Sequence, residues 1–380
     1  MLEKIVLVTA GGHVSSFHAA MLEMYNTLEA MSPGRFELYG AEGGLSGLND
    51  GKFILINLED IDENRAGSMI GSNREHLDIE RARQAISENN IYAVIMMGGD
   101  NHLGEAEKGF EAGLPFIGWP KTMDGDLSSL ITLGYETAVV NAVNFTKSHY
   151  NTAITSERVF YVVTFGRDTD WIGCGVSAYA DVMSIGAEEV YSWDFIRGKI
   201  AEDVENNKQK YGVGFSVVHV SEGVKINEMK DPPEEHQKKD GHGEVKLQPK
   251  WVALELERLS EASGFTSASQ VYEYTLRDLP PTETDKRLAK MAGKECIKAA
   301  LEQDFGVCPF FKQDGDFYRV VRGPLNEIAK KSFVKGKVFF DYDNLRSTPA
   351  FLEVYGNLFR DSLGKPSNRD DLVYRNRVKR

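Results

Sequence analysis

Residues 92–126 decide the fold that we expect, and they read YAVIMMGGDNHLGEAEKGFEAGLPFIGWPKTMDGD. Residues 92–97 are an apolar run typical of a buried strand, and the run stops at Gly-Gly-Asp, residues 98–100. A helical pattern then leads to a second short strand, residues 114–118, which precedes the acidic turn 121–126. A strand, a helix and a strand in this order form a parallel pair, so the stretch predicts an α/β fold.

The same alternation recurs on both sides of this stretch. Residues 4–10, 159–164 and 215–220 are further strand-like runs, and each ends in a polar or glycine-rich turn. Parallel sheets bind ligands at the carboxyl ends of their strands, and a helix that starts there offers its N–H groups to a phosphate. We therefore expect the turns after these strands to form the functional site.

Composition limits the possible partners. The chain has 380 residues, 42% of them apolar, which is enough for two domains, and its formal net charge is -13. This acidic balance argues against nucleic acid or an anionic membrane as a general partner. No apolar run reaches the length of a membrane helix, and the cysteines, Cys174, Cys296 and Cys308, are too widely spaced for a metal site. These features predict a soluble cytoplasmic protein with buried structural thiols.

The residues in these turns suit phosphoryl transfer, which needs backbone donors, cations, a metal carboxylate and a base for the acceptor hydroxyl. In the order of these roles, the candidates are Gly11 and Gly12, then Arg74, Lys121 and Arg167, then Asp100, then Asp124. We expect the surrounding cations to keep the pKa of Asp124 low. The alternative for the Asp-Gly-Asp sequence is an ordinary turn without chemistry.

Taken in order along the chain, these motifs resemble the phosphofructokinase family. The residues that carry the resemblance are Gly11-Gly12, RAGSMIGSNR (65–74), GGD (98–100), PKTMDGD (120–126), LGYETA (133–138), Arg158, FGR (165–167), Glu222, and Arg277 with the PPTETDKRLA that follows. The resemblance covers roughly residues 1–325. It implies two Rossmann-like α/β domains with parallel-rich sheets flanked by helices, and an active site in the cleft between them.

The resemblance also implies roles for individual residues. Asp124 matches the catalytic base, with Thr122, Lys121 and Arg167 beside it, and Asp100 matches a carboxylate that binds Mg²⁺. The donor-phosphate group is Gly11, Gly12, Arg74, Gly99 and Asn101. The sugar-phosphate group is Asp126, Arg158, Phe165, Gly166, Glu222, Tyr274 and Arg277. Arg158 resembles the arginine that one subunit donates to its neighbour, which implies a homodimer or homotetramer.

Two positions bear on the phosphoryl donor. Lys121 makes PKTMDGD similar to the pyrophosphate-dependent members, because a lysine there can neutralise a compact, highly charged donor. Asn101 is neither the glycine usual in ATP-dependent members nor the aspartate of pyrophosphate-dependent ones. We expect pyrophosphate as the donor, with ATP as the alternative.

The acceptor implied by the resemblance is fructose 6-phosphate, phosphorylated at its 1-hydroxyl. The chain departs from the family pattern at Phe165, at Asp170, at Asp278-Leu279 after the sugar-site arginine, and at Ala268, where many members carry a second intersubunit arginine. The missing arginine keeps a related sugar phosphate, such as sedoheptulose 7-phosphate, as an alternative acceptor.

Two other classes of function are weaker. A non-catalytic, sugar-phosphate-binding regulatory paralogue would be expected to lose the base or the metal carboxylate, and both are present. A dinucleotide-binding dehydrogenase needs G-x-G-x-x-G after its first strand, and GGHVSS (11–16) does not supply it.

The predicted domain organisation follows from the order of the motifs. The phosphoryl-donor domain comprises residues 1–136 with 277–322, and the sugar-phosphate domain comprises 137–276 with 323–363. Residues 224–250, rich in Lys, Asp and Glu, predict an exposed charged insertion, and residues 364–380 predict a polar C-terminal tail.

Overall fold

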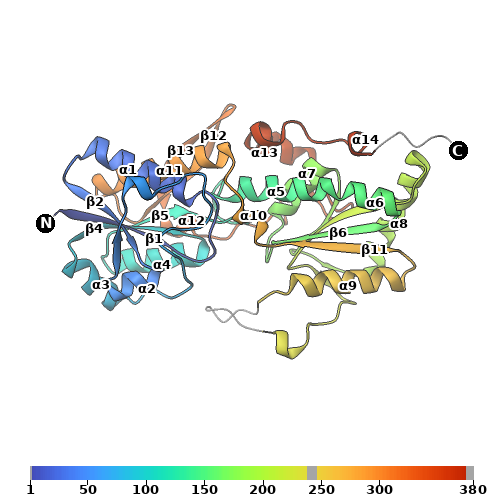
Figure 1. The fold of residues 1–380 in the computed structure, drawn as a ribbon, viewed down its shortest axis with the longest axis horizontal. Coiled ribbons are helices and arrows are strands. Elements are labelled where there is room, and N and C mark those ends of the chain that lie inside the picture. Colours follow the sequence, from blue (N-terminus) through green and yellow to red (C-terminus); the bar gives the residue numbers. More distant parts are fainter. Residues whose placement is uncertain (1, 238–245, 374–380) are drawn as a thin grey trace. The chain divides into compact units, whose positions relative to one another are not determined.

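The structure, a computed structural model, describes residues 2–237 and 246–373 and divides the chain into two compact units. Unit 1 comprises residues 1–137 and 277–332, and unit 2 comprises residues 138–276 and 333–380. Both units are α/β structures with parallel-rich sheets flanked by helices, as expected (Figure 1). Across the residues that the structure describes, no helix combines the length and the apolar character needed to cross a membrane.

Unit 1 is built on a sheet with the strand order β3-β2-β1-β4-β5, in which β3 alone runs antiparallel to its neighbour. Its strands are β1 (Glu3–Thr9), β2 (Phe36–Ala41), β3 (Phe53–Leu55), β4 (Ile91–Gly98), β5 (Phe116–Pro120), β12 (Val307–Asp314) and β13 (Phe317–Pro324). Its helices are α1 (Phe17–Met31), α2 (Leu45–Asp50), α3 (Ile79–Glu88), α4 (Asp100–Glu111), α11 (Glu283–Leu301) and α12 (Leu325–Ile328), with a 3-10 turn at Leu58–Asp60.

Unit 2 is built on a parallel sheet with the order β11-β6-β9-β7. Its strands are β6 (Val159–Thr164), β7 (Met183–Ile185), β8 (Val190–Tyr191), β9 (Ser216–Ser221), β10 (Lys225–Ile226), β11 (Ser267–Tyr272), β14 (Phe340–Asp341) and β15 (Arg346–Ser347). Its helices are α6 (Tyr150–Ser156), α7 (Trp171–Ala180), α8 (Trp193–Tyr211), α9 (Pro249–Ala262), α13 (Pro349–Leu363) and α14 (Arg369–Leu372), with a 3-10 turn at Glu234–His236. Helices α5 (Tyr135–Ser148) and α10 (Thr275–Asp278) each include a boundary between the units.

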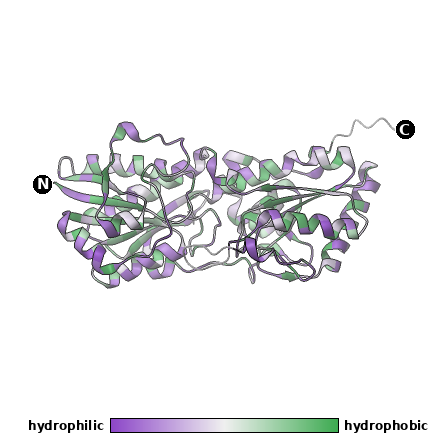
Figure 2. Cartoon of the chain, turned by 60° about the horizontal axis from the view of Figure 1, so that its bottom comes forward, coloured by the Kyte–Doolittle hydropathy of each residue, from purple (hydrophilic) through white to green (hydrophobic). Residues whose placement is uncertain are grey.

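The core of each unit lies along its central strands. Every residue of β5, β6 and β9 is buried, which explains why these strands read as continuous apolar runs without alternation. Figure 2 shows hydrophobic residues concentrated in the strands, while the helices carry hydrophilic residues on their outer sides. In α11, the side chain of Thr282 accepts a hydrogen bond from the backbone N–H of Asp285 and thereby caps the helix.

Three predicted boundaries need correction. Residues 323–332 belong to unit 1, because β13 pairs with β12 along its whole length. The insertion begins inside the core of unit 2, because Val224 and Ile226 are buried and β10 pairs with β8. Its described remainder, residues 227–237 and 246–250, is mostly exposed, whereas residues 238–245 lie outside the described residues.

The prediction that residues 364–380 form a polar tail also needs correction for its first part. Arg369 is buried, and its guanidinium lies 2.6 Å from the Asp203 carboxylate and 2.9 Å from the Asn207 side-chain oxygen. The sequence looked polar because the residue that fixes this segment is a buried arginine paired with α8. Residues 374–380 lie outside the described residues.

Candidate functional site

The candidate donor residues of unit 1 lie at one edge of its sheet, which we call the donor edge. Gly11 follows β1, Gly99 and Asp100 follow β4, and Lys121 follows β5. These parallel strands are neighbours in the order β1-β4-β5, so their carboxyl ends meet at the same edge. The structure therefore brings together turns that are about a hundred residues apart in sequence.

The turn after β1 depends on glycine. Gly11 has φ +77°, a conformation that L side chains rarely adopt. Its N–H donates to the carbonyl of Asn73 at 2.8 Å, and its own carbonyl accepts from the Ser72 hydroxyl at 2.7 Å. These bonds hold the loop that ends in the exposed Arg74 next to the glycine turn.

Lys121 is a buried cation beside this turn. Its ammonium lies 3.3 Å from the position that a Cβ on Gly11 would take, and the ring of His102 lies at 3.2 Å from the same position. Burial, and then the positive charge of Arg277, lower the pKa of Lys121 to about 7. The site is thus short of negative charge, and a polyanion bound there would restore the charged form of the lysine.

Carboxylates gather at the same edge. Lys331 lies 3.5 Å from Asp100 and 4.0 Å from Asp126, measured between the ammonium and a carboxylate oxygen. Burial, and then the charges of Asp124 and Asp100, raise the pKa of Asp126 to about 7. These groups are close enough to repel one another, which is the arrangement that gives a carboxylate a perturbed pKa in an active site.

The expected low pKa of Asp124 is wrong. Burial raises the pKa of this carboxyl, and the opposing effects of Arg277, Lys121 and Lys331 are smaller. The sequence showed the cations but not the loss of water around the carboxyl. The turn itself is held by the hydroxyl of Thr122, which accepts from the backbone N–H of Asp124 at 3.1 Å, while Gly125 takes φ +75°.

Arg277 lies in unit 1, next to the turn after β1 that carries Gly11 and Gly12. A Cβ placed on Gly12 would lie 2.2 Å from the Arg277 guanidinium, so this arginine covers the glycine. The hydroxyl of Ser15 donates to the carbonyl of Arg277 at 2.9 Å. The resemblance grouped this residue with the sugar phosphate, and its position adds a cation to the edge that carries Lys121 and Asp124.

The candidate sugar residues of unit 2 also share one sheet edge. Phe165, Gly166 and Arg167 follow β6, Glu222 follows β9, and Tyr274 comes two residues after β11. The rings of Phe165 and Tyr274 lie edge to face with centroids 5.7 Å apart. The backbone N–H of Glu222 donates to the Thr164 carbonyl at 2.9 Å, which fixes the turn after β9 against the end of β6.

Arg158 lies away from this group. It immediately precedes β6, so it is at the opposite end of the strand from Gly166, and about 20 Å of extended chain separate it from Thr164, where the strand ends. Its Nε is buried and, among the described residues, has no hydrogen-bond partner. Ala268 pairs with Phe160 near the same end of the sheet. Both positions of the expected intersubunit pair therefore lie at the edge opposite to the other sugar residues.

Sequence reasoning missed three charged or titratable residues near the donor edge, namely His13, His102 and Lys331, and noted Asp278 only as a departure from the family pattern. His102 comes two residues after the GGD motif and could have been included on that ground. Lys331 is about two hundred residues from Asp126 and lies there because Leu127 bridges to it. No local spacing predicts that contact.

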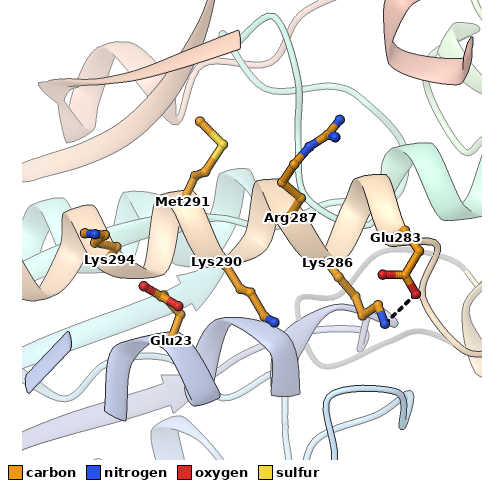
Figure 3. A pocket seen from close by; sticks show the side chains of 7 residues that line it. All are labelled: Glu23, Glu283, Lys286, Arg287, Lys290, Met291 and Lys294. Carbon is orange, nitrogen blue, oxygen red and sulfur yellow. Dashed lines mark ion pairs between the residues drawn. The ribbon is translucent and has the colours of Figure 1, made fainter. Parts of the chain in front are cut away.

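A pocket elsewhere in unit 1 does not coincide with these residues. It has a volume of about 360 Å³ and lies between α1 and α11, and its lining is Glu23, Glu283, Lys286, Arg287, Lys290, Met291 and Lys294 (Figure 3). Lys286 pairs with Glu283 at 2.7 Å, and Lys290 pairs with Glu63. Carboxylates of the protein thus already neutralise part of its positive charge, and we place the functional site at the sheet edge instead.

The carboxylates of the donor edge suit a Mg²⁺ ion that the substrate phosphates also help to bind. Within residues 2–237 and 246–373, no group of three or more His, Cys, Asp or Glu could hold a metal ion without other ligands. However, the charges of Asp124 and Asp100 add to the effect of burial in raising the pKa of Asp126, because the three carboxylates are neighbours. One or two carboxylates completed by substrate phosphates and water are what Mg²⁺ prefers in proteins.

Comparison with known proteins decides the family. Residues 4–300 match the family described as phosphofructokinase. The chain belongs to the phosphofructokinase family. It is therefore a member of a family of phosphotransferases, which confirms the resemblance that the motifs indicated.

Relatives within the phosphofructokinase family carry two kinds of name. The chain is 29% identical over 340 residues to the pyrophosphate--fructose 6-phosphate 1-phosphotransferase of Thermoproteus tenax, with 87% of this chain and 94% of the relative covered. It is 30% identical over 314 residues to ATP-dependent 6-phosphofructokinase 2 of Streptomyces coelicolor, with 80% and 89% covered. Relatives with either donor in their names thus match this chain at nearly the same identity.

Solved phosphofructokinases share the fold. The pyrophosphate-dependent phosphofructokinase from Marinobacter aquaeolei superimposes with a TM-score of 0.79 at 18% identity, covering 96% of this chain and 93% of that one. The corresponding structure from Nitrosospira multiformis gives a TM-score of 0.77. At this identity the likeness concerns the fold.

Proposed function

We propose that the chain transfers a phosphoryl group from pyrophosphate to the 1-hydroxyl of fructose 6-phosphate, giving fructose 1,6-bisphosphate and phosphate. The observation that carries this proposal is the buried Lys121, whose ammonium lies 3.3 Å from the Cβ position of Gly11. An ammonium in that position occupies space beside the glycine turn and favours a short, highly charged donor. Gly11, Gly12, Arg74, Gly99 and Asn101 bind the donor phosphates in this proposal.

Asp124 acts as the base. It takes the proton of the 1-hydroxyl while the sugar oxygen attacks the terminal phosphorus and the bridging P–O bond of pyrophosphate breaks. The raised pKa of Asp124 makes the carboxylate a better proton acceptor as charge develops on the attacking oxygen. Thr122 holds the turn, and Lys121 and Arg167 stabilise the transferred group.

Asp100 holds Mg²⁺ in this proposal, together with the donor phosphates. When bound, the ion neutralises charge on the phosphates and thereby lowers the cost of bringing the acceptor to them. Lys331, 3.5 Å from Asp100, orients this carboxylate.

The acceptor is held by Asp126, Phe165, Gly166, Glu222, Tyr274 and Arg277, and by Arg158 of a neighbouring subunit. A homodimer or homotetramer follows from this assignment, because Arg158 lies at the far end of β6 from Gly166. We also place the protein in the cytoplasm, since Cys174, Cys296 and Cys308 are buried free thiols.

A donor assay tests the proposal. With fructose 6-phosphate and Mg²⁺, pyrophosphate should support faster turnover than ATP, and Lys121→Gly should lower kcat/KM for pyrophosphate by about a hundredfold, as for a lost charge-stabilising group. Lys108→Ala, which removes an exposed lysine paired with Glu105, is the control and should change neither donor. A wild-type preference for ATP would overturn the assignment of the donor.

Mixing subunits tests the shared site. Arg158→Ala and Asp124→Ser should each be inactive alone. Mixed oligomers should regain activity, because a subunit with an intact Asp124 can then receive Arg158 from its neighbour. Mixtures that stay inactive, although mass spectrometry shows that subunits exchange, would contradict a donated arginine.

Sedoheptulose 7-phosphate is a second candidate acceptor. Ala268 lies opposite Phe160 in the pairing of β11 with β6, close to the end that carries Arg158, and supplies no charge there. With one arginine fewer on the terminal phosphate, selection by the length of the sugar is weaker. Ala268→Arg should lower KM for fructose 6-phosphate and increase its preference over sedoheptulose 7-phosphate. An unchanged ratio would remove this argument.

A further inference from the structure

Two hydrogen bonds join the turn after β1 to the residues around Arg277. The Nε2 of His13 lies 2.6 Å from a carboxylate oxygen of Asp278, and the hydroxyl of Ser15 donates to the carbonyl of Arg277 at 2.9 Å. The partners are more than 260 residues apart in sequence. One contact is made to the backbone carbonyl of Arg277, and the other to the side chain of the next residue, Asp278.

Arg277 is the charge that these contacts hold in place. Its guanidinium fills the space in which a Cβ on Gly12 would lie, at 2.2 Å. It is also the largest charged influence on both Lys121 and Asp124. A shift of this guanidinium would therefore change the field at the proposed donor lysine and at the proposed base together.

The pair of His13 and Asp278 contributes little to stability. Their side chains are 29% and 49% exposed, and exposed ion pairs are generally worth about 0–1 kcal/mol. Burial, and then Arg277, lower the pKa of His13, so the ring is neutral at pH 7 and its N–H donates to the carboxylate. A short bond with this small energetic value, next to an active-site cation, is better explained by orientation than by folding.

We propose that His13 and Asp278 are positioning residues that fix the guanidinium of Arg277 over the glycine turn. The inference rests on the proposed function of this edge. It gives a role to Asp278, a position at which the chain departs from the family pattern: the carboxylate meets a histidine placed directly after Gly12. This pair of residues, which we call the clamp, preorganises Arg277, so that no binding energy is spent on ordering the guanidinium when phosphate binds.

A double-mutant cycle tests the clamp. His13→Ala and Asp278→Asn should each lower kcat by about tenfold to a hundredfold, as expected for a misplaced catalytic group, with KM changed less than kcat. In an Arg277→Lys background, where the guanidinium is already gone, the same changes should cost less than about twofold. Multiplicative losses in that background would overturn the proposal, because the two residues would then act independently of Arg277.

Two further measurements separate other causes. Glu3→Gln breaks another exposed pair of unit 1, with Arg35 at 3.0 Å, and should leave kcat unchanged. Thermal unfolding of His13→Ala and Asp278→Asn should differ little from wild type, and a large loss of Tm would assign the pair to folding instead. If wild type turned over neither pyrophosphate nor ATP, the proposed function would fail. Wild-type turnover with unaffected variants would refute only the clamp.

Discussion

The turn from Lys121 to Asp126 and the pair of Asp203 with Arg369 both place charge inside the protein, but they give it different partners. The Arg369 guanidinium lies 2.6 Å from Asp203 and 2.9 Å from Asn207, and the other Asp203 oxygen accepts from Ser216 at 2.7 Å. In the turn, the ammonium of Lys331 is 4.0 Å from Asp126.

The pKa values of the charged groups in the two regions shift in opposite ways as a consequence. Burial lowers the pKa of Lys121 and raises that of Asp126, both to about 7, so each loses part of its charge near neutrality. For Arg369, Tyr150 and then Asp203 raise the pKa in spite of burial. Charge that the protein satisfies by itself fixes the fold, whereas charge left short of partners is available to a ligand.

The largest effect is expected at the turn. Asp124→Ser should lower kcat by about a thousandfold or more, the upper range for losing a general base, with little change in Tm. Removing Asp124 also relieves the repulsion that raises the pKa of Asp126. Steady-state kinetics and thermal unfolding check this, with Asp314→Ser on the exposed part of β12 as the control. Near-normal turnover would remove Asp124 as the base.

The opposite pattern is expected at the structural pair. Arg369→Ala leaves Asp203 buried without its guanidinium and should cost about 3–5 kcal/mol of unfolding free energy, while kcat of the folded enzyme stays the same. Urea unfolding measures the loss, and Lys365→Ala, an exposed neighbour, should cost much less. A small loss in Arg369→Ala would show that the comparison between the two regions does not hold.

The smallest effect concerns Asp285, a buried carboxyl with protein donors. It accepts from the backbone N–H of Gly134 at 3.1 Å and from the Thr137 hydroxyl at 2.8 Å, yet burial raises its pKa to about 6. At pH 5 the folded state therefore keeps a proton that the unfolded state has released. The free energy of unfolding should fall by about 2 kcal/mol between pH 4 and pH 6 and level off above pH 7.

Asp285→Asn isolates this contribution. The asparagine cannot ionise, so the difference in unfolding free energy between wild type and variant should change by that amount over the same range. Urea titrations at pH 4, 5, 6 and 7 give the difference. A difference that is constant with pH would mean that hydrogen bonds offset the burial of the charge completely.

Much of the fold could be predicted, because strands buried on both faces read as apolar runs. Residues 159–164 were predicted as a strand with the bounds that β6 has. Strand β2 was not predicted, because its buried and half-buried residues alternate without a continuous apolar run.

The candidate site was predictable where it follows strands and not where it depends on distant contacts. The position of Arg277 over Gly12 and that of Lys331 beside Asp100 require the tertiary fold. The direction of the pKa shift at Asp124 was missed for the same reason, since burial is a property of the packed turn.

Gly223 shows how a residue without chemistry can be as sensitive as one with it. A Cβ at this position, in the turn after β9, would lie 1.8 Å from the carbonyl oxygen of Arg167, and Gly166, in the turn after β6 that carries Arg167, takes φ +139°. In a scan of all single substitutions for activity, substitutions at both glycines should therefore be tolerated as poorly as substitutions at Arg167. A map of intolerant positions would mark the shape of these turns together with their reactive groups, and stability measurements would be needed to tell one from the other.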